Sequence, residues 1–212
     1  AYHKVRIFRT DVQAVCDSLV YSSKDSCLSL YTDPILWQGP QQLLGEEIKV
    51  YMNDSTIDWA HIINQALAVE MNDSIHYNQV TGKEMKAFFR NGEMHQVDVD
   101  GNVLCIYYPV EEGDTTLMMM DYTESSHLRM VLKDRKLERG AFIGHTTGVV
   151  YPMDQIPADR LRLDAFAWFD YVRPRSKEDI FEWRGKGADA VLRKSDRKPI
   201  GSARDLNIKR KK

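Results

Sequence analysis

The side chains that support acid–base or metal chemistry are scattered through this sequence and form no recognisable motif. None of the six histidines stands in a His-x-His or HExxH arrangement, the spacings that bring two imidazoles to one metal ion. We therefore interpret them as surface or turn residues and predict no metal site. They occupy positions 3, 61, 76, 95, 127 and 145.

Carboxylates and hydroxyls also lack the partners that catalysis requires. Asp98 and Asp100 fall on one face of a predicted strand, beside an Asp-Gly turn, and read as a solvated face. Ser22-Ser23 and Ser125-Ser126 lack a nucleophile elbow, and Gly82-Lys83 lacks the preceding glycine of a phosphate loop. The sequence predicts neither an enzyme nor a cofactor.

The three cysteines are too few and too widely spaced for a zinc motif or a disulfide framework. Cys16 and Cys27 lie on either side of a predicted turn at Ser22-Ser23-Lys24, so they could face each other across a hairpin. Free thiols that pack as small hydrophobic groups are the favoured interpretation for these two and for Cys105. Cysteine content leaves the compartment undecided.

The elements that position these side chains are predicted to be β-strands. Between residues 17 and 57, apolar residues alternate with polar ones, as in Ile48, Val50 and Met52. Turn-forming residues interrupt the pattern every eight to twelve positions, for example at Thr32-Asp33-Pro34 and Asn53-Asp54-Ser55. Alternation with this punctuation is typical of antiparallel strands with one buried face.

The strand pattern continues beyond residue 57. Met85, Ala87 and Phe89 alternate with polar or aromatic residues up to Asn91-Gly92, the strongest short hairpin signal. The segment 103–108 carries apolar residues on both faces, which predicts a strand covered on both sides or one lining a cavity.

The pattern weakens towards the C-terminus. Residues 134–151 are less regular, with glycines at 140, 144 and 148. Residues 158–169 permit a short helix, and Arg173-Pro174 would end it. Because uncovered sheet edges promote aggregation, we expect this final segment to cover an open end of the sheet.

The formal net charge of -2 conceals a strong asymmetry. Residues 184–212 hold 11 Lys and Arg against 3 Asp and Glu, whereas residues 1–183 carry a net charge of -10. An acidic body argues against a nucleic-acid partner, and we interpret the basic terminus as a solvated, disordered tail. No apolar run is long enough to span a membrane, and we expect that an export signal has been removed.

Several turn-and-strand blocks resemble the OstA-like (LptA-like) lipopolysaccharide-transport proteins, particularly the longer ones that carry the pattern in tandem. The resemblance covers roughly residues 5–183. The blocks are Asp17-Ser18-Leu19, Asp33-Pro34-Ile35-Leu36-Trp37, Gln42-Leu43-Leu44-Gly45-Glu46-Glu47-Ile48, Tyr77-Asn78-Gln79-Val80-Thr81-Gly82-Lys83-Glu84-Met85 and Val99-Asp100-Gly101-Asn102-Val103.

The resemblance implies an all-β fold, an open β jelly roll of folded-over antiparallel sheets with a short irregular or helical C-terminal segment. We expect an OstA-like β domain over residues 5–157, a closing segment over 158–183 and the basic tail over 184–212. It also implies a periplasmic or outer-membrane-associated protein without cofactor or catalysis. Its partners would be lipopolysaccharide or lipid A, and other envelope transport components or further copies of itself, joined through sheet edges.

In this family the apolar interior cradles lipid A acyl chains, so inward-facing strand residues would serve as core and binding site together. Methionine-rich strands suit variable apolar surfaces, although each methionine taken alone is more simply a core residue. The predicted lining consists of Ile35, Trp37, Ile48, Val50, Met52, Met85, Phe89, Val97, Val99, Met119 and Met130. Basic rim residues that could meet lipid phosphates, or simply be solvated, are Lys49, Lys83, Lys86 and Arg90.

Two other functions remain open from sequence. A structural cell-envelope β scaffold would use the same strands for protein contacts without binding lipid. A carbohydrate-active enzyme would need two carboxylates facing each other across a cleft, about 5 to 10 Å apart, and the sequence contains no such pair that can be identified.

Overall fold

A computed structural model describes residues 1–54, 56–110, 116–134 and 136–185. Its described strands form one antiparallel sheet, which confirms the predicted all-β class. The strands are β1 (Tyr2–Phe8), β2 (Val12–Ser22), β3 (Cys27–Tyr31), β4 (Ile35–Gln38), β5 (Gln41–Leu44), β6 (Glu47–Asn53), β7 (Thr56–Met71), β8 (Tyr77–Arg90), β9 (Glu93–Tyr107), β10 (Met119–Lys133), β11 (Lys136–Ile143) and β12 (Thr147–Pro152). Single 3-10 turns follow at Met153–Gln155 (η1), Ala158–Arg160 (η2), Asp170–Val172 (η3) and Asp179–Phe181 (η4).

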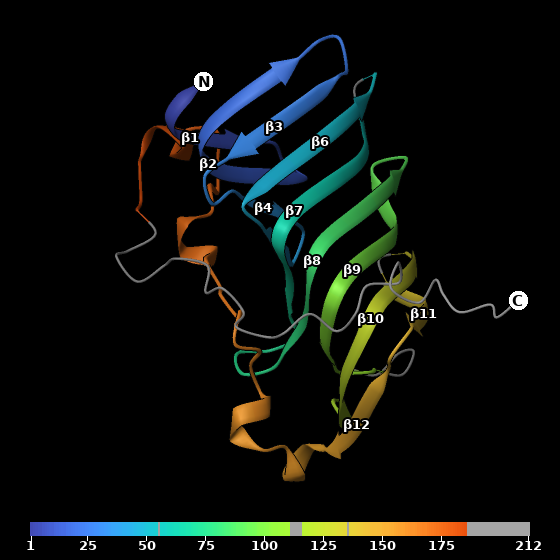
Figure 1. Cartoon of the computed structure of the whole chain (residues 1–212). Coiled ribbons are helices and arrows are strands. Elements are labelled where there is room, and N and C mark those ends of the chain that lie inside the picture. The colour runs from blue at the N-terminus through green and yellow to red at the C-terminus, as the bar shows by residue number, and fades with distance from the viewer. Residues whose placement is uncertain (55, 111–115, 135, 186–212) are drawn as a thin grey trace, which may run out of the picture.

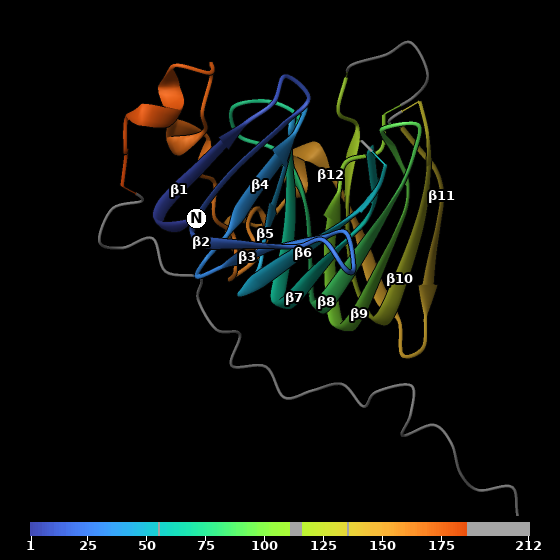
Figure 2. The same ribbon diagram turned by 90° about the horizontal axis from the view of Figure 1, so that it is seen from above.

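The sheet is closed at one end and open at the other. At the closed end β7 pairs with β6 through its first half and with β5 through its second half. β2 likewise pairs with β4 through its first half and with β3 through its second half, and β3 pairs with β6. At the open end β10 pairs with β11 and β12, one along each half of its length. Figure 1 shows β6 to β11 side by side, and Figure 2 shows the strong curvature of the sheet.

The long strands β7 to β10 are each bent near the middle, and we call the line of bends the crease. The pairing register shifts between Ile63 and Ala66, between Thr81 and Glu84, and between Ser125 and His127. In β9 the bend is at Gly101-Asn102, where φ is +81° and +53°. Such β-bulges increase local twist and bend the strand, so one strand can contribute to two layers.

The crease divides the sheet into two layers. Layer 1 contains β3, β6, β11 and the segments 56–63, 84–90, 93–100 and 127–133. Layer 2 contains β1, β4, β5, β12 and the segments 66–71, 77–82, 103–107 and 119–125. Their inner faces pack together in one core, and Gln38 Nε2 donates to Gly92 O across the layers at 3.3 Å. This folded-over arrangement is a jelly roll of the predicted kind.

Of the turns and irregular segments predicted from the sequence, some are confirmed and others are wrong. The Asn91-Gly92 hairpin is confirmed, with positive φ at both residues. The Asp-Gly turn expected at residues 100–101 was wrong, because the chain bends there without reversing and β9 continues. The irregular segment expected at 134–151 contains β11 and β12, since glycines are tolerated in these exposed edge strands.

The C-terminal segment forms a strap, which we define as residues 153–184. It contains the four 3-10 turns, and the helix considered for residues 158–169 is reduced to η2. The strap runs from β12 back to β1, where Arg6 pairs with Asp179 (Figure 1). Contrary to expectation it covers the outer face of layer 2, not the open end of the sheet. Most of the predicted basic tail, residues 186–212, lies outside the described residues.

Candidate binding interior and its outer cover

The interior between the layers is lined by apolar rows that cross the strands. One row pairs Leu30, Ile48, Ile62, Met85, Val99 and Leu128 across β3, β6, β7, β8, β9 and β10, and every member is buried. The facing row of layer 2 includes Leu36, Leu43 and Val80. Because both rows belong to one packed cluster, the closed part of the interior is filled by its own side chains.

Six of the eleven predicted lining residues lie buried in this interior: Ile48, Val50, Met85, Phe89, Val97 and Val99. Met52 and Met130 pack against them and are partly exposed. Ile35 and Trp37 lie elsewhere, in a cluster on the outer face of layer 2 beneath the strap. The period-two pattern gives no means of deciding which face of a strand points inward, so these two were assigned to the wrong face.

The interior becomes accessible at the open end. Leu128 on β10 is buried, whereas its pairing partner Phe142 on β11 is only partly buried. Val150 on β12 pairs with Asp121, faces inward and is 57% exposed. Met119, near the start of β10, is 42% exposed. The open end therefore presents apolar side chains next to the edge strands β11 and β12.

The outer face of layer 1 is charged. Arg129 donates to both carboxylate oxygens of Asp98, at 2.8 and 3.0 Å, and His127 pairs with Asp100. Lys49 pairs with Glu47 on the same face. Hydrogen bonding to Asp98 raises the pKa of Arg129. Asp98 and Asp100 are therefore engaged by side chains of β10 on the outer face of layer 1.

The Ser125 hydroxyl and the cysteine thiols are structural groups here. The hydroxyl of Ser125 is buried in the crease and bonds the carbonyls of His127 and Ile143 at 3.0 Å each. Cys16, Cys27 and Cys105 are all buried, and none of them forms a disulfide within the described part of the chain. Burial, with a smaller contribution from Asp121, raises the pKa of Cys105 to about 12, which keeps that thiol protonated and unreactive. Among the described residues, no group of three metal-ligating side chains is gathered.

Three buried glutamines on the outer face of layer 2 hold the strap, a feature that the sequence reading missed. Gln79 Nε2 donates to Leu161 O, and Gln79 Oε1 accepts from Leu163 N, both at 2.9 Å. Gln42 repeats this geometry: its Nε2 donates to Ala167 O at 2.8 Å, and its Oε1 accepts from Phe169 N at 2.7 Å. The sequence carried no signal for this role, because the burial that obliges each amide to find a hydrogen-bonding partner is decided by the tertiary structure.

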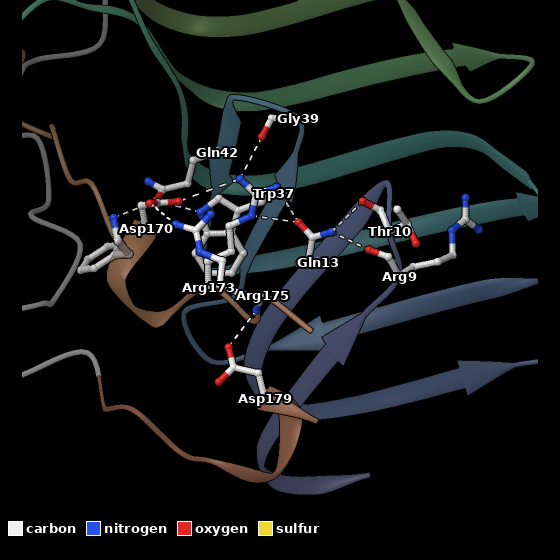
Figure 3. A network of polar contacts seen from close by, with 11 residues as sticks. Arg9, Thr10, Gln13, Trp37, Gly39, Gln42, Asp170, Arg173, Arg175 and Asp179 are labelled. Carbon is white, nitrogen blue, oxygen red and sulfur yellow. Dashed lines mark hydrogen bonds and ion pairs between the residues drawn. The ribbon is translucent and has the colours of Figure 1, made fainter. Parts of the chain in front are cut away.

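The third glutamine, Gln13, binds a side chain of the strap. Its Oε1 accepts from Arg173 Nε at 2.8 Å and from Nη2 at 2.5 Å, while Arg173 Nη1 donates to Gly39 O at 2.9 Å (Figure 3). Burial, and to a lesser extent Arg175, lowers the pKa of Arg173. This guanidinium ties the strap to β2 and to the β4–β5 turn.

Apolar and aromatic contacts accompany these polar ones. Phe166 and Trp168 contact the Tyr77 ring edge-on at centroid distances of 5.2 and 5.4 Å. Phe169 and Val172 are buried against Trp37 and its neighbours, and Leu163 is buried against the face of β9 and β10. The segment 103–107 is therefore covered on both sides, one of the two arrangements that its sequence predicted.

The four helical turns in the described ranges contain three residues each, too few for any of them to traverse a bilayer.

Comparison with known proteins identifies a similar fold but no sequence family. No family model matches the chain, and no curated protein sequence matches it. The crystal structure of LptH, the LptA homologous periplasmic component of the lipopolysaccharide transport device of Pseudomonas aeruginosa, is similar with a TM-score of 0.50. The alignment has 12% sequence identity and covers 66% of this chain and 95% of LptH. The chain thus has an LptA-like fold.

Proposed function

We propose that this protein binds lipopolysaccharide through its lipid A acyl chains and takes part in lipopolysaccharide transport across the periplasm. The observation that carries the proposal is the apolar interior of an LptA-like jelly roll, closed at one end and exposed at the other. Burial of an acyl chain contributes on the order of 0.8 kcal/mol per methylene group, so no catalytic step is required.

Acyl chains would enter at the open end. Met130, Phe142 and Val150 face inward there and are partly or largely exposed, so they can contact a ligand without unpacking the closed core. Residues deeper in the interior, such as Met85 and Val99, would contact lipid only if the layers part. Their role as lining remains a prediction.

The test is saturable binding of purified protein to lipopolysaccharide or lipid A with two neighbouring variants. Val150→Asp places a charge on the inner face of β12 and is expected to weaken binding at least ten-fold, because a desolvated carboxylate would oppose the acyl chain. Val149→Asp is the matched control, since Val149 is 46% exposed on the outer face of the same strand. It should bind like the original protein.

A structural scaffold is the second candidate, favoured by the complete burial of the interior row from β3 to β9. In that case the edge strands β11 and β12, with exposed Ile143 and Val149, would dock further copies of the chain or other envelope components by strand addition. Failure of the folded original protein to bind lipid A, together with association that both edge variants reduce, would replace the lipid proposal with this one.

A further inference from the structure

The strap is attached to the sheet in the way that a peptide ligand is attached to a receptor. None of the strand pairings among the described residues includes it. Its main chain is instead bonded by the side-chain amides of Gln79 and Gln42. Each amide bonds the carbonyl of one strap residue and the N–H of the residue two positions later, so it satisfies two main-chain groups at once.

The two amides occupy equivalent places in the sheet. Gln42 pairs with Val69, and Val69 pairs with Gln79, so the glutamines lie in one row across β5, β7 and β8. The same row continues through Trp37 to Gln13 on β2. The strap follows this row, since Leu161–Leu163, Ala167–Phe169 and Arg173 meet Gln79, Gln42 and Gln13 in order.

Aromatic residues next to the glutamine row also contact particular side chains of the strap. Tyr77, two residues before Gln79 on β8, contacts the Phe166 and Trp168 rings edge-on, and the Arg162 guanidinium lies 4.5 Å from the centre of the Tyr77 ring. At the β10 end Arg160 lies 4.7 Å from the centre of the Tyr122 ring. The hydrogen bonds from the two amides to the main chain fix the register of the strap, and the aromatic and cation–π contacts supply specificity for its side chains.

We propose that the outer face of layer 2 is a binding site for an aromatic-rich peptide, that residues 160–173 occupy it in cis, and that the strap of a second copy can occupy it in trans. The linker makes such exchange feasible, because Asp154, Gln155 and Pro157 are exposed between the end of β12 and the first clamp. Strap exchange would join two copies through this face, independently of the lipid interior and of the edge strands.

The experiment uses the full chain with a specific protease site inserted after Gln155, cleaved only after folding. The cleaved strap is expected to stay bound and to co-elute with the sheet. A fluorescent synthetic peptide of residues 157–184, added in excess, should replace it and bind saturably at one site. Because a buried amide that loses its partner is costly, Gln79→Leu should raise the dissociation constant of the peptide about ten-fold or more.

Two further variants make the result specific. Gln42→Leu should weaken peptide binding comparably, whereas Gln38→Leu should leave it unchanged, because Gln38 is on the inner face of the same layer and bonds Gly92. Unfolding of the sheet after cleavage would overturn the proposal, since the strap would then be part of the core. Retention of the strap with no peptide exchange would do the same, and so would equal peptide affinity in all three glutamine variants.

Discussion

At the scale of single residues, polar groups in this protein are buried where they fix the position of the strap. Gln42 and Gln79 bond main-chain atoms of the strap, while Gln13 accepts from Arg173 of the strap and donates to the carbonyls of Arg9 and Thr10, so the burial of all three amides is compensated. Arg6 is the exception. Its guanidinium is 1% exposed, lies 3.9 Å from Asp179, and has no hydrogen-bond partner at any of its three nitrogens. Burial is the main cause that lowers the pKa of Arg6.

Replacement of Arg6 by methionine is therefore expected to be neutral or mildly stabilising, because it removes a buried charge without hydrogen bonds while Asp179 keeps its bonds from Arg175 N and Arg184 Nη2. Arg9→Met is the control: Arg9 is half-exposed and pairs with Asp11, so its loss should change the free energy of unfolding by about 1 kcal/mol or less. Urea unfolding measures both. A loss of more than about 2 kcal/mol for Arg6→Met would contradict this account.

The hydrogen bonds of the Asp73 carboxylate predict how stability depends on pH. Its carboxylate bonds the His76 ring and the N–H groups of Ile75 and His76, and the His76 side chain is the main cause that lowers its pKa to about 2. Because the pKa of Asp73 is lower in the folded protein than in the unfolded chain, these bonds stabilise the fold at pH values above about 4, the pKa of the unfolded chain. That contribution is lost as the pH falls towards 2.

NMR titration of the carboxyl carbon should place the Asp73 midpoint near pH 2. His76→Ala should move it upward, because the largest cause of the shift is removed. An unchanged midpoint in that variant would assign the shift to the backbone bonds alone.

At the scale of elements, the crease is the device that turns one sheet into two layers. It is built from residues that tolerate positive φ, namely Asn64, Gln65, Gly101 and Asn102. Gly82 lies on the same line, and a Cβ there would meet Val99 Cγ1 at 2.5 Å. These positive-φ residues belong to β7 and β9, whereas β8 and β10 bend at register shifts without them.

Gly101→Ala is expected to destabilise the protein more than Gly92→Ala. Both glycines have φ near +80°, so alanine at either position costs about 1–2 kcal/mol. A Cβ at Gly101 would also meet Lys83 Cβ at 2.9 Å, whereas a Cβ at Gly92 meets nothing within 4 Å. We expect about 1–3 kcal/mol of additional loss at Gly101 from this overpacking, measured by chemical denaturation. Equal losses of unfolding free energy in the two variants would show that the backbone at the crease shifts to accommodate the added Cβ.

At the scale of the whole molecule, stability is expected to be graded from the closed end to the open end. The closed end is a ring of paired strands with a buried core on both faces, whereas β11 and β12 are exposed edge strands. A ligand entrance at the open end would therefore lie in the less stable part of the sheet.

Amide hydrogen exchange should reveal that gradient. Protection should be greatest in β7 to β9 and lowest in β11 and β12, with the Leu163 and Phe169 amides of the strap protected by their glutamine acceptors. Gln79→Leu should deprotect Leu163 while β9 remains protected. Uniform protection from β7 to β12 would contradict the graded picture.

The sequence by itself determined the strand-rich class, the Asn91-Gly92 hairpin and a strand at residues 103–107 covered on both sides. These properties depend on local alternation and turn chemistry, which are encoded over a few residues. Alternation also grouped Ile48, Val50, Met85 and Val99 on inward-facing positions.

Only the tertiary structure decided which face of each strand became the interior. Trp37, predicted to line the interior, therefore lies instead on the outer face beneath the strap. The sequence could not distinguish the bend at Gly101-Asn102 from a turn, because both use residues that tolerate positive φ. The difference is that after a bend β9 continues to pair with the same neighbour, β10, whereas a turn would reverse the chain. The glutamine row depends on three strands and a segment up to 160 residues away in sequence. Such contacts arise from long-range register, which no local pattern specifies.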